Sequence, residues 1–385
     1  MFYRISCINR ISMIRLNYIN DTKMIKLNQK EERIVSIFLQ NREMQSSEVH
    51  SKIMKLGEEI SLVTIKRTLT KMVEKGILLV KGLGRSTAYE LSVSGRIFAE
   101  VNAREYLSVE PDKRYGLHGY NFDLFSSFPS EVFFEEEIEK LDKVTREYKE
   151  KTKDISSVIA KKELERLVIE LSWKSSKIEG NTYTLLDTEK LILKNKPAEG
   201  KTKQETQMIL NHKGAFNFVY NNKTFFKTLA RENIEEIHKR LVNELDVAVG
   251  LRKSAIGVSG SVYRPLDNIY QIGEAIEVLS KKINQMKTAY AKSIVALLGI
   301  SYIQPFDDGN KRTSRIMADA LLMANNFVPL SYRSVDEKEY KEAMLTFYEL
   351  NSIMPFKKIF IEQYDFSARN YAIKLKTEPD FRNSS

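Results

Sequence analysis

Cysteine is almost absent from this chain, which has a single such residue, Cys7, among 385. One cysteine can form neither an internal disulfide nor a cysteine-based zinc site, so the sequence excludes both. The chain also lacks any apolar run close to the roughly 20 residues that cross a bilayer. Its first 23 residues lack the uninterrupted apolar centre of a signal peptide. These absences predict a cytoplasmic protein without a membrane partner.

Three widespread motifs are missing as well. No G-x-x-x-x-G-K-(S/T) segment occurs, which excludes a P-loop, and no H-E-x-x-H segment occurs, which excludes that zinc site. The glycines at 82 and 84 lack the third glycine and the following helix of a dinucleotide site. Any phosphate binding must therefore use another motif.

Basic residues are in excess, with 61 Lys and Arg against 51 Asp and Glu. This surplus suits a polyanionic partner such as nucleic acid or a nucleotide, although many proteins are mildly basic. The apolar share of 42% is enough for a packed core, and the length fits two or three domains.

Changes of pattern divide the chain into five segments. They are a weakly ordered N-terminal extension (1–29), a winged-helix domain (30–92), a connector (93–130), a helical domain (131–372) and a C-terminal tail (373–385). Met24 is an alternative start, because a better-behaved segment begins there. The fold class that we expect is mainly α.

The segment 30–92 has the order of a winged helix-turn-helix domain. Apolar residues at helical spacing predict a first helix, a second helix opens with Ser46 as its cap, and a third runs from Ser61 to Gly76. Two apolar runs on either side of residues 82–84 then predict a β-hairpin. Three helices followed by a hairpin are typical of this fold.

Cations lie on both elements that would approach DNA, the third helix and the hairpin tip. These candidate DNA-binding residues are Lys66, Arg67, Lys71, Lys81 and Arg85. DNA is therefore an expected partner. The alternative is a winged helix that packs on its own chain or on another protein.

The connector is expected to begin with one short helix, 95–107, and then to pack on the neighbouring domain through the aromatic segment 115–129. From 131 to 372, helices alternate with short loops. The exception is 254–264, where alternation around glycines predicts a short hairpin or flap.

The stretch QPFDDGNKRTSR, between two apolar helices, carries the most chemical information. It leads into a helix N-terminus, which suits an anion. Gly309 lets the backbone approach a ligand, and Asn310 can donate from its amide. Arg312 and Arg315 can lean to a similar face and grip phosphate oxygens. Asp308 is placed to hold a divalent ion that bridges those phosphates.

This stretch resembles the Fic signature, H-x-F-x-(D/E)-G-N-G-R-x-x-R, and the resemblance covers about 150–372. It implies an all-helical Fic core with a small β-hairpin flap, ATP as the nucleotide, and transfer of AMP to a protein hydroxyl. It further implies that Asp308 binds Mg²⁺ and that Arg315 meets the γ-phosphate. The implied nucleotide-binding residues are Gly309, Asn310, Lys311, Arg312 and Arg315.

Two positions depart from the signature. Lys311 replaces its second glycine, as in the related Doc kinases, so a phosphotransferase is an alternative. Gln304 replaces the catalytic histidine, and a glutamine amide cannot take the proton of the attacking hydroxyl. We expect nucleotide binding to persist and transfer to be slower by about 10² to 10⁴. Asp307 is an alternative, weak base.

The chain has four histidines, and none is expected to substitute for the missing one. His50 lies in the winged-helix segment and His118 in the connector. His212 and His238 lie on helices among apolar neighbours, so each is interpreted as a packed or capping residue.

A second family pattern, (S/T)-x-x-x-E-(G/N), is matched by Ser175, Glu179 and Gly180 at the end of a predicted helix. Ser175 and Glu179 are one turn apart and share a face. The resemblance implies that Glu179 pairs with Arg315 and excludes a productive γ-phosphate. The alternative is an ordinary glutamate at a helix end.

The segment 250–265 resembles the family's flap, whose main chain would pair with an extended segment of a target protein. The implied target-binding residues are Val258, Ser259, Gly260, Ser261, Val262 and Tyr263. A plain β-turn loop is the alternative.

The sequence therefore predicts a nucleotide-binding protein on an adenylyltransferase scaffold, inhibited by Glu179 and impaired by Gln304. It would use ATP and Mg²⁺ and an unknown target protein. A DNA-binding regulator with a catalytically inactive, ATP-sensing Fic domain is the alternative.

Overall fold

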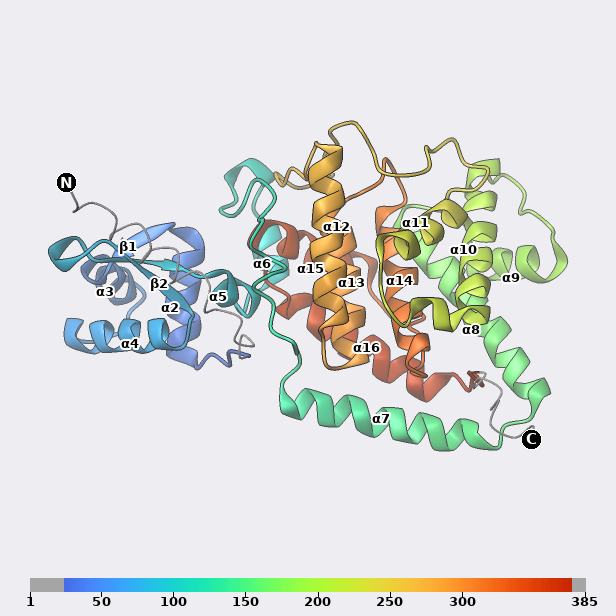
Figure 1. Cartoon of the computed structure of the whole chain (residues 1–385), viewed down its shortest axis with the longest axis horizontal. Helices are drawn as coiled ribbons and strands as arrows, with labels where there is room; N and C mark the ends of the chain where they lie inside the picture. The colour runs from blue at the N-terminus through green and yellow to red at the C-terminus, as the bar shows by residue number, and fades with distance from the viewer. Residues whose placement is uncertain (1–23, 376–385) are drawn as a thin grey trace, which may run out of the picture.

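The computed structural model describes residues 24–375 and forms two lobes joined side by side (Figure 1). The smaller, N-terminal lobe combines three helices with an antiparallel sheet of order β1-β3-β2. Its elements are α2 (Gln29–Gln40), β1 (Glu43–Gln45), α3 (Ser46–Lys55), α4 (Leu62–Glu74), β2 (Leu78–Lys81) and β3 (Ala88–Leu91). Three helices followed by a hairpin confirm the winged-helix fold.

Local signals account for most of the small lobe. Ile65, Leu69 and Met72 are fully buried on one face of α4, as the helical spacing requires. Ser61 caps that helix, because its hydroxyl accepts a hydrogen bond from the Thr64 backbone at 3.2 Å. The predicted cap at Ser46 is wrong. Ser46 is the first residue of α3, and the preceding backbone N–H donates to Glu48 instead.

The connector differs from its predicted single helix. It forms two short helices, α5 (Val93–Ile97) and α6 (Ala103–Leu107), with an extended break between them. The break lets the Ile97 carbonyl accept a hydrogen bond from the Ile353 backbone at 3.0 Å. The aromatic segment packs on the larger lobe as expected, since Tyr120 stacks on Tyr302 with ring centroids 5.2 Å apart. The connector therefore fixes one lobe to the other.

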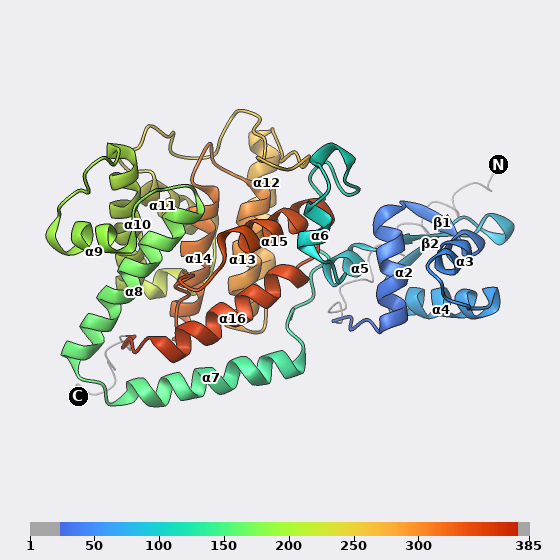
Figure 2. The same cartoon turned by 180° about the vertical axis from the view of Figure 1, so that it is seen from behind.

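The larger lobe is helical throughout. Its helices are α7 (Glu135–Lys153), α8 (Ser157–Ile178), α9 (Leu185–Lys194), α10 (Lys203–Asn221), α11 (Arg231–Leu241), α12 (Ile269–Asn284), α13 (Ala289–Ile303), α14 (Asn310–Ala324), α15 (Glu337–Leu350) and α16 (Met354–Asn370). Figures 1 and 2 show α7 lying along one side of this lobe, where it packs on α16.

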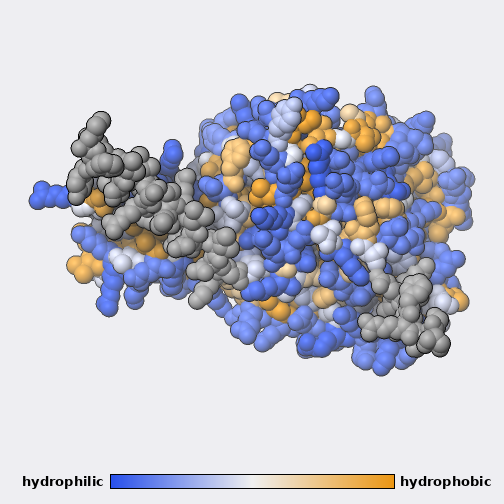
Figure 3. Space-filling view, viewed as in Figure 1, coloured by the Kyte–Doolittle hydropathy of each residue, from blue (hydrophilic) through white to orange (hydrophobic). Residues whose placement is uncertain are grey.

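Helices α13 and α14 form the centre of the larger lobe. Every residue of α13 except Lys292 is buried, and so is every residue of α14 except Lys311. Because both helices are buried, the loop between them starts and ends on rigid elements. Outside this core, mostly polar side chains cover the face of the protein in Figure 3, with apolar residues scattered among them.

The expected hairpin at 254–264 is not formed. This flap has a turn, closed by a hydrogen bond from the Ser261 N–H to the Val258 carbonyl, but no paired strands. Its single β-bridge joins Arg264 to Gly119 of the connector. Side chains from elsewhere in the fold, rather than a strand partner, hold its backbone.

The described parts of both chain ends contain buried residues. Ile25 and Ile373 are buried, and the Tyr148 hydroxyl donates to the Ile373 carbonyl at 2.6 Å. Most of the predicted N-terminal extension and tail, 1–23 and 376–385, lies outside the described residues. Within 24–375, no helix is both long and apolar enough to cross a bilayer.

Candidate functional site

The loop between α13 and α14 turns the chain sharply at both of its ends. Gln304 ends α13 with a left-handed backbone (φ 51°), and Gly309 precedes α14 with φ 81°. A Cβ at Gly309 would lie 3.3 Å from a methyl of Val242, so a side chain there would be both strained and crowded. The first backbone N–H groups of α14 lack intrahelical partners, which favours an anion.

Asn310 keeps this loop closed. Its side-chain amide donates to the Phe306 carbonyl and accepts from the Phe306 N–H, both at 2.8 Å. From the sequence, that amide was expected to donate to a ligand. In the structure the amide N–H and the amide oxygen both bond Phe306 within the loop, so Asn310 can offer an anion its backbone N–H instead.

His238 supports the same loop from below. Its ring stacks on Phe306 with centroids 3.7 Å apart and planes 8° from parallel. Its Nε2 lies 3.0 Å from the Asp308 carbonyl, an acceptor, so Nε2 is the nitrogen that carries the proton. Burial lowers the pKa of His238 to about 4, which keeps the ring neutral. The sequence identified a packed histidine but missed its place under this loop.

A pocket of about 180 Å³ lies in front of the loop. Its lining residues come from α8, the flap and the α13–α14 loop: Glu179, Ile256, Gly257, Gln304, Asp307, Asp308, Gly309, Asn310, Lys311 and Arg312. Most of the predicted nucleotide residues thus meet at one place, whereas the predicted target-binding residues 258–263 lie outside this lining. The volume is below the roughly 300 Å³ of small-molecule pockets and suits a phosphate chain better than a nucleoside.

Arg315 lies behind the pocket, fully buried, and reaches back to the end of α8. It donates to a Glu179 carboxylate oxygen at 2.8 Å, to the Ser175 hydroxyl at 2.7 Å and to the Ser175 carbonyl at 2.9 Å. The other Glu179 oxygen lies 3.9 Å from the Lys311 ammonium. Burial by itself would raise the pKa of Glu179, but Arg315 and Lys311 outweigh it and lower that pKa.

Asp308 is the only predicted metal ligand, and its side chain is 67% exposed at the pocket rim. One of its oxygens accepts a hydrogen bond from Arg312 at 2.8 Å. The described residues contain no cluster of three or more His, Cys, Asp or Glu that could hold a metal alone. A single exposed carboxylate such as that of Asp308 fits Mg²⁺, which proteins usually hold through one or two carboxylates together with substrate phosphates.

Gln304 is buried, and its amide donates to the Ser301 carbonyl at 2.6 Å. Arg252, which was not predicted from the sequence as a site residue, binds the backbone next to Gln304. It donates to the carbonyls of Gln304 (2.6 Å) and Ser254 (2.7 Å), and also to that of Leu266. One arginine thus ties the pocket to both ends of the flap. What could have indicated this role in the sequence is the position of Arg252, two residues after Gly250 at the start of the flap.

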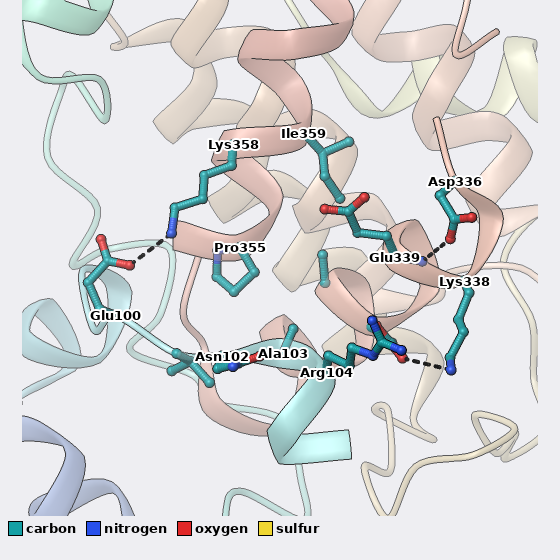
Figure 4. Close-up of a pocket in the computed structure, with 13 residues that line it drawn as sticks. Glu100, Asn102, Ala103, Arg104, Asp336, Lys338, Glu339, Pro355, Lys358 and Ile359 are labelled. Atoms are coloured by element: carbon teal, nitrogen blue, oxygen red, sulfur yellow. Dashed lines mark hydrogen bonds and ion pairs between the residues drawn. The ribbon is translucent and has the colours of Figure 1, made fainter. Parts of the chain in front are cut away.

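A larger hollow of about 850 Å³ lies between the connector and helices α15 and α16 (Figure 4). Glu100 and Lys358 pair across it at 3.3 Å, and Arg104, Lys338 and Glu339 also line it. The lining carries four acidic side chains and three basic ones, which are Glu100, Asp336, Glu339 and Glu342 against Arg104, Lys338 and Lys358. The hollow therefore lacks the surplus of donors that a phosphate group requires.

The candidate DNA-binding cations of the small lobe are all exposed. Lys66, Arg67 and Lys71 lie on α4, and Lys81 and Arg85 lie on the wing. Lys81 pairs with Glu90 at 3.0 Å, so its charge is partly neutralised within the wing.

Two family models match the chain. The Fic/DOC family matches residues 228–322, and the penicillinase repressor family matches residues 27–116. The first match contains α11, the flap and the α13–α14 loop, and the second contains the winged helix.

Curated relatives are named protein adenylyltransferases. The Fic protein of Aedes aegypti is 28% identical over 191 residues, which are 48% of this chain and 38% of that protein. The one from Nematostella vectensis is 28% identical over 212 residues, 53% of this chain and 49% of that protein. The chain thus matches 38% to 49% of the length of these two relatives.

Solved structures share the fold. Fic-1 from Caenorhabditis elegans has a TM-score of 0.52 at 18% identity, covering 61% of this chain and 70% of the other. A Fic-domain signaling protein from Bacteroides thetaiotaomicron also has a TM-score of 0.52, at 16% identity, covering 62% and 100%. The larger lobe thus contains a Fic/DOC domain, over residues 228–322, and a winged-helix domain precedes it in the chain.

Proposed function

We propose that this protein binds ATP with Mg²⁺ on a scaffold for AMP transfer, and that Glu179 restrains the site while Gln304 impairs the transfer step. One observation carries the proposal: Arg315 is held by Glu179 and Ser175 directly behind a pocket that is lined by Gln304 and the α14 N-terminus. The curated relatives named adenylyltransferases support the same chemistry for this fold.

The phosphate chain would lie against the first turn of α14. Gly309, Asn310 and Lys311, at the start of α14, line the pocket, and Arg312 lines it as well with a buried side chain. Asp308 would hold Mg²⁺, whose chemistry is to neutralise phosphate charge and orient the oxygens. Arg312 would then be freed from Asp308 to contact phosphate oxygens.

Glu179 restrains this arrangement by occupying Arg315. A γ-phosphate and the Glu179 carboxylate are both anions that need the same guanidinium, so they compete for it. Because the pKa of Glu179 is lowered, its carboxylate stays ionised and the ion pair persists at neutral pH.

Gln304 would leave the target hydroxyl without a base. Its amide has no basicity and is bonded to the Ser301 carbonyl. Positioned general-base catalysis typically contributes about 10² to 10⁴ in rate, and this factor is the loss that we assign to Gln304.

Calorimetric titration of the full chain with ATP and ADP, in the presence of Mg²⁺, tests nucleotide binding and restraint together. Glu179→Gly should raise the affinity for ATP about tenfold, because a charge-assisted contact to Arg315 is exchanged for the γ-phosphate. The affinity for ADP, which lacks that phosphate, should change by less than about twofold. Glu199→Gly, at an exposed glutamate outside the pocket lining, is the control. Absence of ATP binding in every variant, or an equal gain for ADP, would overturn the proposal.

A second candidate is a DNA-binding regulator whose Fic domain senses ATP without catalysis. The match to penicillinase repressors over 27–116 and the exposed cations of α4 favour it. The two roles are compatible if the small lobe binds DNA and the large lobe binds the nucleotide. The cytoplasmic location stays a prediction from the sequence.

A further inference from the structure

The flap is attached to the connector through a buried carboxylate, Glu349, near the end of α15. One of its oxygens accepts a hydrogen bond from the Ser261 hydroxyl at 2.6 Å and lies 3.0 Å from a guanidinium nitrogen of Arg114. The other oxygen accepts from the Tyr106 hydroxyl at 2.7 Å. Glu349 is fully buried and the Arg114 side chain is 3% exposed, so water does not replace these contacts.

Arg114 also reaches the turn of the flap directly. Its guanidinium donates to the Gly260 carbonyl at 2.6 Å. Two neighbouring flap residues, Gly260 and Ser261, are therefore held by one ion pair between the connector and α15.

The main chain of the connector is seated at the same corner. The Leu117 N–H donates to the Glu349 carbonyl at 2.7 Å. At Gly116, which has φ 142°, a Cβ would lie 2.7 Å from that same carbonyl oxygen, so only glycine fits. Further along, the His118 carbonyl accepts from the Arg264 N–H at 2.8 Å. The connector thus contacts the flap at its turn and again at its end.

We propose that Arg114 and Glu349 are positioning residues for the flap, so that the connector of the winged-helix domain sets the shape of the surface on which a target protein segment docks. This rests on the proposed function and on the prediction from the sequence that the flap binds the target protein. A flap without paired strands has no ladder to fix its backbone, and pairing with an extended peptide requires N–H and C=O groups in a preset row.

The ion pair between Arg114 and Glu349 explains why these two residues position the flap. Removing Arg114 leaves the Glu349 carboxylate buried beside Ser261 and Tyr106 without its cation, which is strongly unfavourable. Local relaxation of the flap toward water would relieve that charge. The phosphate loop is closed by Asn310 and supported by His238, whose hydrogen bonds are made to the loop itself, so it should not respond.

Hydrogen exchange of the full chain, read by mass spectrometry, tests the proposal. In Arg114→Ala, peptides that cover 254–266 should exchange about tenfold faster, while peptides that cover 306–315 keep their native rate. Arg114→Lys, which keeps the charge, should restore part of the protection. Arg104→Ala is the matched control, because Arg104 lies on the same connector but lines the hollow of Figure 4.

Two results would overturn the proposal: an unchanged flap in Arg114→Ala, or a rise in exchange shared by the whole chain. If Arg114→Ala does not fold, Ser261→Ala decides, because it removes the hydroxyl that joins the flap to Glu349. Exchange is measured without nucleotide. A failure to bind ATP would therefore contradict the proposed function alone. Unchanged hydrogen exchange of the flap in Arg114→Ala would contradict the positioning role alone.

Discussion

Two fully buried histidines, His212 and His238, lie close to the arginines of the pocket. Burial is the main reason that both have lowered pKa values, to about 4 for His238 and well below 6.5 for His212, and Arg312 lowers both further. Neutral imidazoles are what the site requires, because a second cation beside Arg312 would be repelled. The same burial makes the fold sensitive to acid.

Stability should therefore fall as the pH drops below 6.5. In that range the histidines are protonated in the unfolded chain but stay neutral in the folded chain, so the free energy of unfolding decreases as the pH falls. The decrease continues until the pH reaches the pKa of the folded state, which is about 4 for His238. Between pH 7 and 5 the loss should be about 1 to 2 kcal/mol per histidine. Urea unfolding of the native chain and of His238→Phe, which keeps a ring on Phe306, measures it. An equal loss in both chains would refute this account.

Arg252 acts at a single position on three carbonyls, those of Gln304, Ser254 and Leu266. A lysine cannot reproduce this fork, because its ammonium is a compact point charge. We expect Arg252→Lys to lower the free energy of unfolding by about 2 to 3 kcal/mol, with the exposed neighbour change Lys253→Arg as control. Equal stability of the two variants, measured by urea unfolding, would rule out this role for Arg252.

At the scale of elements, the α13–α14 loop is closed by Asn310 and supported by α11. Removing the Asn310 amide would leave the Phe306 N–H and carbonyl buried without partners. The loop would open, and the N–H groups at the start of α14 would no longer converge on one point.

Asn310→Ala should therefore weaken ATP binding by about tenfold or more in the titration described above. The control is Asn325→Ala, at the other end of the same helix, where the amide bonds only the Leu321 carbonyl. Equal affinities in the two variants would mean that the loop does not depend on its internal amide.

The flap shows where an element could not be predicted from sequence. Alternation around its glycines indicated a hairpin, but its backbone is held by Arg252 and by the connector. Periodicity describes neighbours along the chain, whereas Ser261 and its partner Glu349 are 88 residues apart. The helices α4, α13 and α14 were predictable because capping and burial patterns are local.

The same limit applies at the site. Gly309 and the cations after it could be found from their spacing, and the Glu179–Arg315 pair was expected only through the family resemblance. Nothing local reveals that Arg114 would meet Glu349, since those residues lie in different elements and touch only in the folded chain.

At the scale of the whole molecule, the winged helix and the Fic core share one apolar cluster and are joined at the corner between α15 and α16. Helix α4 belongs to the small lobe (Figure 1), and its Lys66, Arg67 and Lys71 are exposed. Such an arrangement leaves the cations free to contact phosphates of a duplex.

Binding to duplex DNA should consequently weaken with salt. If the three lysine and arginine side chains of α4 each contact a phosphate, replacing all three by alanine should reduce the log–log salt slope by about 2 to 3. Fluorescence anisotropy over a salt series measures this, with Lys190, Lys196 and Lys203 of the large lobe replaced as the control. If the protein does not bind duplex DNA even at about 50 mM salt, the prediction that its winged helix binds DNA is wrong.

The central claim is that a site built for AMP transfer is restrained by Glu179 and lacks its base at Gln304. The measurement that tests it most directly is labelling of the protein itself with α-labelled ATP and Mg²⁺. The chains compared are the native one, Glu179→Gly, and Glu179→Gly combined with Gln304→His, each also incubated with γ-labelled ATP. We predict α-label on the double variant alone. Labelling of Glu179→Gly without the histidine would contradict the role given to Gln304, and γ-label in place of α-label would show a phosphotransferase instead.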